Sequence, residues 1–357
     1  MVESEPSMLV VSDVHLGALN SNLEQFGLFL DKIINGQYGQ DLQALIILGD
    51  LIDLGTTVES TFSTDKKIVN ILTQLLEIKK KTPIIFVPGN HEVPITSSLT
   101  SGTYDEKFNR RKEKFLKKFT NTIVGELFET NMVCQYIILS KWESESTLLL
   151  YDSQDQIYKH PIQRIILSKL DLEENYKCLM VHGYHFESDT IRIFVGPIWK
   201  SMISYQNLEI KEVYNYFWNV VLKGQRKIKS ITIEDMKSDL IKLKELPSEE
   251  IDVLFSGLNN LEFNLIKLNM RIMRNYRNSR NLSFYIKGIE EFFEEANCDF
   301  SPITHIIYGH SHIKGSSNET INDRQIKIIN CGTWEPSKVS YVEILNGGKI
   351  NVKSFNS

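Results

Sequence analysis

Short apolar runs that each end in a polar tip recur along the first quarter of the chain. Residues 21–35 and 66–80, which separate these runs, space their apolar side chains as an amphipathic helix does. The runs are residues 8–11, 44–48 and 83–87, and their tips are Ser12-Asp13, Gly49-Asp50 and Gly89-Asn90-His91. This alternation of strand, loop and helix predicts an α/β fold in which the polar tips meet at one edge of a sheet.

The rest of the chain continues the pattern and interrupts it once. Further strands are predicted at residues 135–139, 147–151, 177–181 and 303–308, and the last two end at His182 and His310. The tail alternates like a second, more antiparallel sheet, with runs at 325–329, 339–344 and 350–352. Between His182 and His310, residues 197–296 show helical periodicity, which predicts a helical insertion.

Composition limits the classes of partner and compartment. The chain has 357 residues with 40 Lys and Arg against 45 Asp and Glu, so its net charge of −5 provides no global field for a polyanion. The cysteines show neither paired nor dense spacing, which favours a reducing compartment, and we expect the cytoplasm. They are Cys134, Cys178, Cys298 and Cys331. No signal-like segment and no apolar run of membrane-spanning length are seen, so neither export nor a membrane span is expected. The oligomeric state is not indicated.

Ligand-type side chains gather in the polar tips. Asp13 and His15 stand two residues apart, as do His310 and His312, so an extended backbone points both members of each pair to one side. A single such pair is more often turn chemistry, but the ordered combination of several is not. The candidate metal ligands are Asp13, His15, Asp50, Asn90, His182, His310 and His312. A mixed Asp, His and Asn set without cysteine suits first-row divalent metals and argues against a thiolate zinc site.

Five segments together resemble the motifs of the calcineurin-like metallophosphoesterases. They are Ser12-Asp-Val-His-Leu-Gly17, Gly49-Asp-Leu-Ile-Asp53, Gly89-Asn-His-Glu92, His182-Gly183 and Gly309-His-Ser-His312. The resemblance implies a four-layer α/β/β/α sandwich of two mixed sheets with the metals at one edge. It covers about residues 8–186 and 300–357. We therefore expect a metallophosphoesterase domain of residues 1–186 and 300–357, with residues 187–299 as the helical insertion.

The resemblance also implies a role for each candidate. Asp13, His15 and His312 would bind one cation and Asn90, His182 and His310 a second, with Asp50 bridging the two. A metal-bridging hydroxide would attack phosphorus. His91 would be the general acid or transition-state stabiliser and Asp53 the carboxylate that orients it. The alternatives are a structural role for His91 and an ordinary loop carboxylate for Asp53. Manganese is the favoured metal, and Fe, Zn, Ni and Mg remain open.

The substrate is less constrained than the chemistry. A phosphodiester or pyrophosphate-type bond is slightly favoured over a monoester, in a small-molecule, lipid or nucleotide-type substrate. A DNA nuclease of the Mre-type is the leading alternative, because similar first and second motifs occur there, although the acidic net charge disfavours nucleic acid. A binding scaffold that keeps the fold without turnover is the other alternative.

The insertion carries one further feature. Basic residues recur every three or four positions, at Lys267, Arg271, Arg274, Arg277 and Arg280. We hypothesise a specificity cap in which Arg271, Arg274 and Arg277 face an anionic part of the substrate, and the alternative is a solvated helix face. The charged segment at residues 104–120 is interpreted as such a face.

Overall fold

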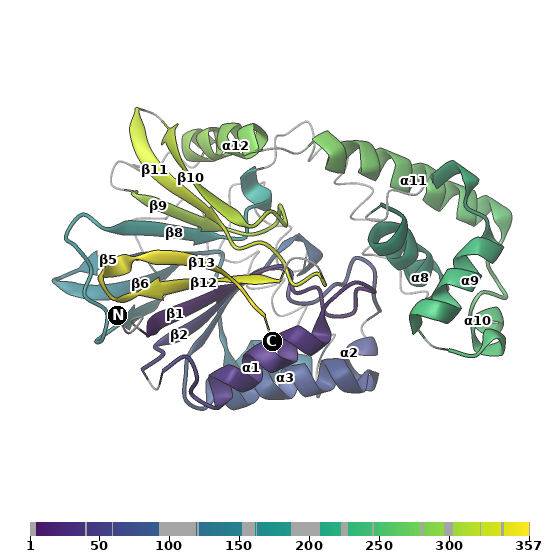
Figure 1. Cartoon of the computed structure of the whole chain (residues 1–357), viewed down its shortest axis with the longest axis horizontal. Coiled ribbons are helices and arrows are strands. Elements are labelled where there is room, and N and C mark those ends of the chain that lie inside the picture. Colours follow the sequence, from purple (N-terminus) through teal and green to yellow (C-terminus); the bar gives the residue numbers. More distant parts are fainter. Residues whose placement is uncertain are drawn as a thin grey trace.

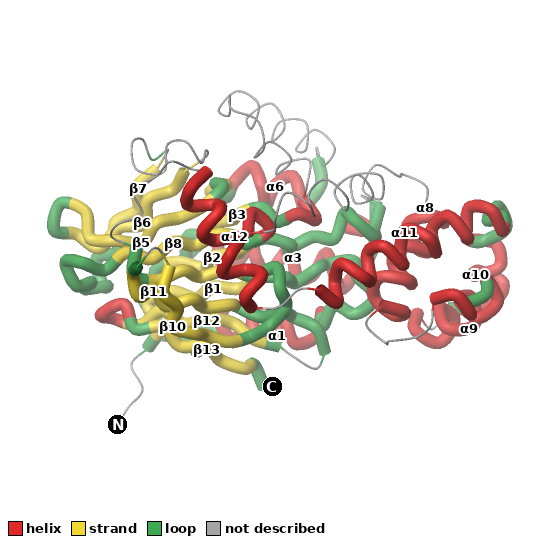
Figure 2. Tube along the Cα trace, turned by 90° about the horizontal axis from the view of Figure 1, so that it is seen from above, coloured by secondary structure: helices red, strands yellow, loops and turns green. Residues whose placement is uncertain are grey.

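The computed structural model describes most of the chain (Figure 1). The described residues are 5–39, 41–58, 60–92, 119, 121–151, 161, 163–186, 208–222, 228–244, 246–279, 282–295, 303–321, 323–336 and 339–356. Within them, the strands form two sheets and the helices lie on the outer faces or in a separate lobe (Figures 1 and 2).

The first sheet has six described strands in the order β13-β12-β1-β2-β3-β4. Their bounds are β1 Pro6–Val11, β2 Ala44–Leu48, β3 Ile84–Val87, β4 Met132–Val133, β12 Ser340–Leu345 and β13 Ile350–Ser354. Strands β1 to β4 are parallel, and β12 and β13 join them antiparallel on the β1 side. The parallel strands β2 and β3 are apolar and buried along their whole length, as expected of strands covered on both faces.

The second sheet has seven described strands in the order β10-β11-β9-β8-β5-β6-β7. Their bounds are β5 Tyr136–Trp142, β6 Glu145–Tyr151, β7 Gln163–Ile166, β8 Lys177–Val181, β9 His305–Tyr308, β10 Gly315–Ile321 and β11 Arg324–Asn330. At its centre, β8, β9 and β11 are parallel, whereas the other pairings are antiparallel.

The layers follow from where the apolar faces point. The two sheets pack face to face through a common core that includes Val10, Ile46 and Met180. Helices α1 (Leu23–Ile34) and α3 (Lys66–Lys79) cover the first sheet, together with α2 (Thr61–Thr64) and α6 (Ile123–Thr130). Helix α12 (Leu282–Glu295) covers the second sheet (Figure 2). Its side chains Tyr285, Ile289 and Phe292 are buried there. The expected four-layer α/β/β/α sandwich is confirmed.

A helical lobe stands beside the sandwich, at the right of Figure 1. It comprises α8 (Leu208–Tyr216), a π-helical turn, α9 (Ile233–Lys244), α10 (Ser248–Leu254) and α11 (Asn260–Ser279) around its own apolar core. The buried Lys211 of α8 fastens the lobe to the sandwich by donating to the carbonyl oxygens of Leu54 (2.6 Å) and Gly55 (3.3 Å). The lobe and α12 both lie within the predicted insertion, but α12 belongs to the outer layer of the sandwich.

The tail does not form the second sheet that its alternation predicted. Strand β11 pairs with β9 in the second sheet, whereas β12 and β13 extend the first sheet beside β1. Alternation predicts that a segment is a strand, but the choice of neighbour depends on long-range packing. The polar edge strand β10 was not predicted, because its sequence, Gly-Ser-Ser-Asn-Glu-Thr-Ile, lacks apolar side chains except at its end.

We predict that Gly288→Ala destabilises the protein. A Cβ at this position of α12 would lie 1.7 Å from the carbonyl oxygen of Phe186, which is backbone and cannot rotate away. Overpacking of this kind costs about 1–3 kcal/mol, whereas Gly→Ala inside a helix ordinarily stabilises by about 0.5–1 kcal/mol. Urea unfolding should therefore give a lower midpoint for Gly288→Ala. Lys287→Ala, at an exposed position of the same helix, is the control and should leave the midpoint nearly unchanged. A stabilised Gly288→Ala variant would contradict the close packing of α12.

Candidate metal centre

Five strands from both sheets deliver the candidate ligands to one edge of the sandwich. Strands β1, β2 and β3 of the first sheet end before Asp13, Asp50 and Asn90, and β8 and β9 of the second end before His182 and His310. Backbone hydrogen bonds then join neighbouring loops, from Asp13 N to Gly49 O (3.1 Å), from His15 N to Asp50 O (2.8 Å) and from Gly309 N to His182 O (2.9 Å). The loops therefore hold one another in place.

Several of these residues have left-handed backbone conformations. Their φ angles are 55° at Asp13, 54° at His15, 53° at Asp50, 65° at His310 and 58° at His312. The left-handed conformation costs a residue with a Cβ about 1–2 kcal/mol. Non-glycine residues kept in this region cluster at functional sites, where the surrounding structure holds them. The extended backbone expected at the two pairs is therefore wrong: left-handed turns place Asp13 and His15 in one candidate ligand group and divide His310 and His312 between two.

One group that could hold a metal ion consists of Asp13, His15 and His312. The Nδ1 of His312 donates to Glu335 Oε1 (2.9 Å), which leaves its Nε2 3.1 Å from Asp13 Oδ1 and 3.2 Å from His15 Nε2. Asp13 Oδ1 is buried and accepts no hydrogen bond, whereas Asp13 Oδ2 accepts from the N–H of His310 (2.8 Å). A buried carboxylate oxygen that faces two imidazole nitrogens fits a divalent cation.

A second group consists of Asp50, His182 and His310. The Nδ1 of His182 donates to Leu48 O (2.7 Å), so its Nε2 is directed at Asn90 Oδ1 (3.2 Å) and Asp50 Oδ2 (3.3 Å). Asp50 Oδ2 also lies 3.8 Å from His15 Nε2, so this carboxylate faces both groups. The donor set again fits a divalent cation, and the seven ligands predicted from the sequence lie together at this edge.

His91 and Asp53 lie beside the two groups. The Nδ1 of His91 donates to Asp53 Oδ1 (2.7 Å), and Asp53 is held in turn by the N–H (3.0 Å) and the hydroxyl (2.8 Å) of Thr56. The remaining ring nitrogen of His91 lies 3.8 Å from Asp50 Oδ2. With His15, the pair also forms a third group of metal-ligand type.

Burial and opposite charges shift the pKa values at this edge in opposing directions. Burial alone would raise the pKa of the Asp13, Asp50 and Asp53 carboxyls, but neighbouring histidines hold each of them below its usual value. Burial would lower the pKa of His182 and His91, yet nearby carboxylates raise the first to about 9 and also raise the second. Burial and the adjacent His91 lower the pKa of His15. The buried acids are therefore ionised and balanced by the ring nitrogens around them.

Glu92 is a structural member of the site to which the sequence analysis gave no role. Its side chain is fully buried and accepts backbone N–H bonds from Gly89 (2.8 Å), Asp50 (3.0 Å) and Ile52 (2.8 Å). Burial and the nearby Asp50 carboxylate raise the pKa of Glu92 to about 7. One side chain thus joins the loops after β2 and β3. The sequence indicated Glu92 only by its position at the end of the third motif, Gly89-Asn-His-Glu92.

The basic positions of the insertion do not form one uniform stripe where their side chains are described. The Nζ of Lys267 donates to Ile231 O (2.7 Å) and lies 5.5 Å from the ring centroid of Phe263, whereas Arg271 is exposed. The side chains of Arg274 and Arg277 lie outside the described residues, as do Arg280 and residues 104–118. The hypothesis of an arginine-lined specificity cap therefore stays a prediction.

One known family accounts for most of the sequence. The sequence profile described as calcineurin-like phosphoesterase matches residues 6–314. The chain belongs to the calcineurin-like phosphoesterases. The family expected from the five motifs is thereby confirmed, and with it a metal-dependent phosphoesterase.

Solved structures also resemble this phosphoesterase, and two of them do so at low sequence identity. A dimetal phosphatase from Danio rerio aligns with 99% of this chain and 100% of its own, at 9% identity and a TM-score of 0.37. GAP50 of Plasmodium, described as the anchor in the inner membrane complex, covers 97% of this chain and 82% of its own, at 11% identity and a TM-score of 0.30. No curated protein matches the phosphoesterase in sequence. Among the described helices, none is both long and apolar enough to cross a membrane.

We predict that Glu92→Gln destabilises the phosphoesterase and weakens its hold on metal. The amide nitrogen of Gln cannot accept, so at least one of the buried N–H groups now bonded to Glu92 loses its partner, at a cost of about 1–3 kcal/mol. Urea unfolding and metal content after dialysis are the two measurements. Glu173→Gln changes an exposed loop residue in the same way and should alter neither. If Glu92→Gln and Glu173→Gln had equal stability and equal metal content, Glu92 would not be needed to hold the loops after β2 and β3 together.

Proposed function

We propose that this phosphoesterase is a dinuclear hydrolase of phosphodiester or pyrophosphate-type bonds. The observation that carries the proposal is the position of Asp50, whose Oδ2 faces the ring nitrogens of His15 and His182 in two adjacent ligand groups. Asp13, His15 and His312 would hold one cation, Asn90, His182 and His310 the other, and Asp50 both. Two cations bound in this way would polarise the phosphoryl group, offset its charge and lower the pKa of a water between them.

The proposed metal is manganese, with Fe, Zn, Ni and Mg as the alternatives to be compared. The donor set combines carboxylate and amide oxygens, which suit Mn and Mg, with imidazole nitrogens, which suit Fe, Zn and Ni. Hydrogen bonds from Nδ1 of His182 to Leu48 O and from Nδ1 of His312 to Glu335 leave Nε2 of each ring as the atom that would coordinate a cation. These bonds orient both rings before any cation binds.

His91 is proposed to act on the transition state. Its Nδ1 is committed to Asp53, so its other ring nitrogen, which lies on the Asp50 side, is the atom that meets an oxygen of the substrate. Asp53 keeps the ring in one orientation, and Thr56 keeps Asp53 in place. A positioned imidazole can donate a proton or a hydrogen bond to a phosphoryl or leaving-group oxygen.

We call the edge of the sandwich where the candidate ligands lie the metal edge. Space near it supports a substrate with two ester groups. A groove of about 1000 Å³ runs from Gly17 and Thr57 between α1, α3 and the helical lobe. A second, smaller hollow opens beside Ser311, the residue between His310 and His312 in the sequence. A monoester needs room for one organic group only. The two hollows favour a phosphodiester or pyrophosphate-type substrate.

The proposed compartment is the cytoplasm. The described cysteines, Cys134, Cys178 and Cys331, are buried and carry no disulfide. Burial raises the pKa of Cys178 and Cys331, which makes both thiols poor nucleophiles and poor redox centres. The cysteine spacing in the sequence, which lacks the pattern of a disulfide framework, is what supports a reducing compartment.

Turnover should require added divalent metal and should favour a diester. The metal-stripped chain, reloaded separately with Mn, Fe, Ni, Zn and Mg, would be assayed on bis(nitrophenyl) phosphate, nitrophenyl phosphate and single-stranded DNA. We expect only the reloaded samples to hydrolyse substrate. The rate should be highest with Mn as the metal and with the diester as the substrate. Metal-independent turnover would contradict the dinuclear mechanism, and faster turnover of the monoester would contradict the substrate class. DNA hydrolysed in preference to the diester would support the nuclease alternative.

His91→Ala should retain metal and lose turnover. General acid–base groups contribute about 10²- to 10⁴-fold to rate, whereas the ring of His91 is outside the proposed ligand set. Metal analysis and kinetics on the same preparation are the measurements. Asp13→Asn is the matched comparison, because it should lose metal and activity together. If His91→Ala lost metal in proportion to activity, His91 would be a ligand and not a catalytic residue.

A further inference from the structure

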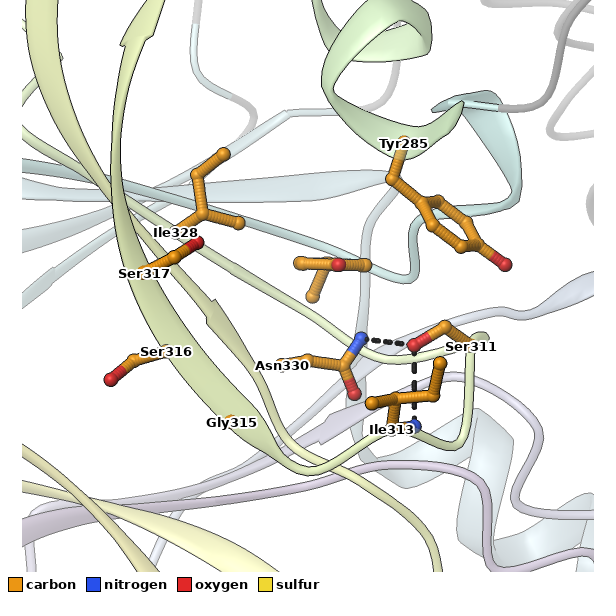
Figure 3. A pocket seen from close by; sticks show the side chains of 9 residues that line it. Tyr285, Ser311, Ile313, Gly315, Ser316, Ser317, Ile328 and Asn330 are labelled. Carbon is orange, nitrogen blue, oxygen red and sulfur yellow. Dashed lines mark hydrogen bonds between the residues drawn. The ribbon is translucent and has the colours of Figure 1, made fainter. Parts of the chain in front are cut away.

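An apolar pocket lies between α12 and the β10–β11 hairpin (Figure 3). Its volume is about 180 Å³, and its walls include the rings of Tyr285 and Tyr308 and the aliphatic side chains of Ile313 and Ile328. Gly315, Ser316 and Ser317 line it from β10. The register pairs Ser317 with Ile328 and Gly315 with Asn330, so these four residues share the face of the hairpin that lies toward α12.

The pocket opens directly beside the metal edge. Ser311 lines it and stands between the candidate ligands His310 and His312. The ring centroid of Tyr285 lies 6.5 Å from that of His310. A group attached to a phosphoryl at the metal edge therefore needs only a short connection to enter the pocket.

The polar side chains in the wall of the pocket are bonded to one another and to the backbone. The amide nitrogen of Asn330 donates to Ser311 Oγ (2.8 Å) and to Gly309 O (2.9 Å), and its Oδ1 accepts from Gly332 N (2.8 Å). The N–H of Ile313 donates to Ser311 Oγ (3.3 Å), as the dashed lines in Figure 3 show. Asn330 therefore braces the loop that carries the two histidines, and the pocket offers a ligand mainly apolar surface.

The size of the pocket and the exposure of its rim indicate the occupant. A cavity of about 150 Å³ lined by apolar side chains can bind benzene, so 180 Å³ accommodates one ring-sized group. Ile313 is 56% exposed at the rim, next to His312, and a ligand in the pocket would cover it. Burial of an apolar ring against these side chains supplies binding free energy in proportion to the area removed from water.

We propose that this pocket binds a ring-sized apolar group, aromatic or cyclic, carried on the phosphoryl group of the substrate. The proposal rests on the proposed function, because the phosphoryl group is what brings the ring to the pocket. Among the lining residues, Gly315 has no side chain and so leaves room for the ring. A Cβ at Gly315 would meet nothing within 4 Å, so a larger side chain there extends into free space in the pocket and displaces no other residue.

Calorimetric titration of the Mn-loaded full chain with phenylphosphonate and methylphosphonate tests the proposal. Both probes carry a phosphonate that is not hydrolysed, and they differ in the ring alone. Burial of a side-chain-sized apolar group predicts that phenylphosphonate binds about 10- to 100-fold more tightly. Gly315→Val should reduce this preference to less than about threefold through its effect on phenylphosphonate. The preference is a ratio of binding constants, so it is measured without any turnover.

Asn318→Val is the matched control. It adds the same side chain to the same strand, but on the opposite, exposed face and outside the pocket, so the preference should stay at the wild-type value. Ile313→Ser, at the exposed rim, should reduce the preference a few-fold without a change in unfolding midpoint. The proposal is overturned if wild type binds both phosphonates equally, or if the preference survives in Gly315→Val. If the preference holds but no phosphoester is hydrolysed, the pocket stands and the proposed function fails.

Discussion

Parallel pairing of strands at the centre of both sheets is the constraint on which the rest of the structure depends. The pairs β1–β2 and β2–β3 in one sheet and β8–β9 in the other make successive strands end at the same edge, so each following loop meets its neighbours. Parallel strands need crossovers, and these are the helices that cover the outer faces. The metal edge, the buried sheet core and the outer helices are therefore consequences of one pairing pattern, and a different register would separate Asp13 from Asp50.

Several buried carboxylates lie together at that edge. Hydrogen bonds from the surrounding backbone offset the cost of burying their charge. Buried carboxylates are costly unless they are hydrogen-bonded or paired. Here Asp13 accepts from the N–H of His310, Asp50 from the N–H of His91, and Glu92 joins two loops through three further N–H groups. The same bonds hold left-handed residues in place. The strain in these loops is thus compensated by the bonds that orient the ligands.

Much of this arrangement could be predicted from the sequence, and the exceptions share a cause. Apolar runs with polar tips predicted β1, β2, β3 and β8, because burial and alternation are local properties of a segment. The sheet to which β11, β12 and β13 belong could not be predicted, because partner choice depends on contacts between distant segments. The motifs identified the candidate ligand residues. Glu335, which orients His312, lies 23 positions away from it and belongs to no motif. A residue that acts only by orienting another residue cannot be recognised from a single sequence when it belongs to no motif.

The helices between β8 and β9 in the chain contact loops that carry candidate ligands, and this limits how the site can vary. In the lobe, Lys211 and Asn215 of α8 bind the loops that follow β2 and β1, through Leu54 O and through Leu19 N. Helix α12, in contrast, is fixed against Phe186 by the close approach at Gly288, and it carries Tyr285 to the ring of His310. A change that loosens either contact moves both a wall for the substrate and a loop that bears ligands. The proposed substrate walls and the candidate ligands are therefore coupled in this chain, because the same short loops carry both.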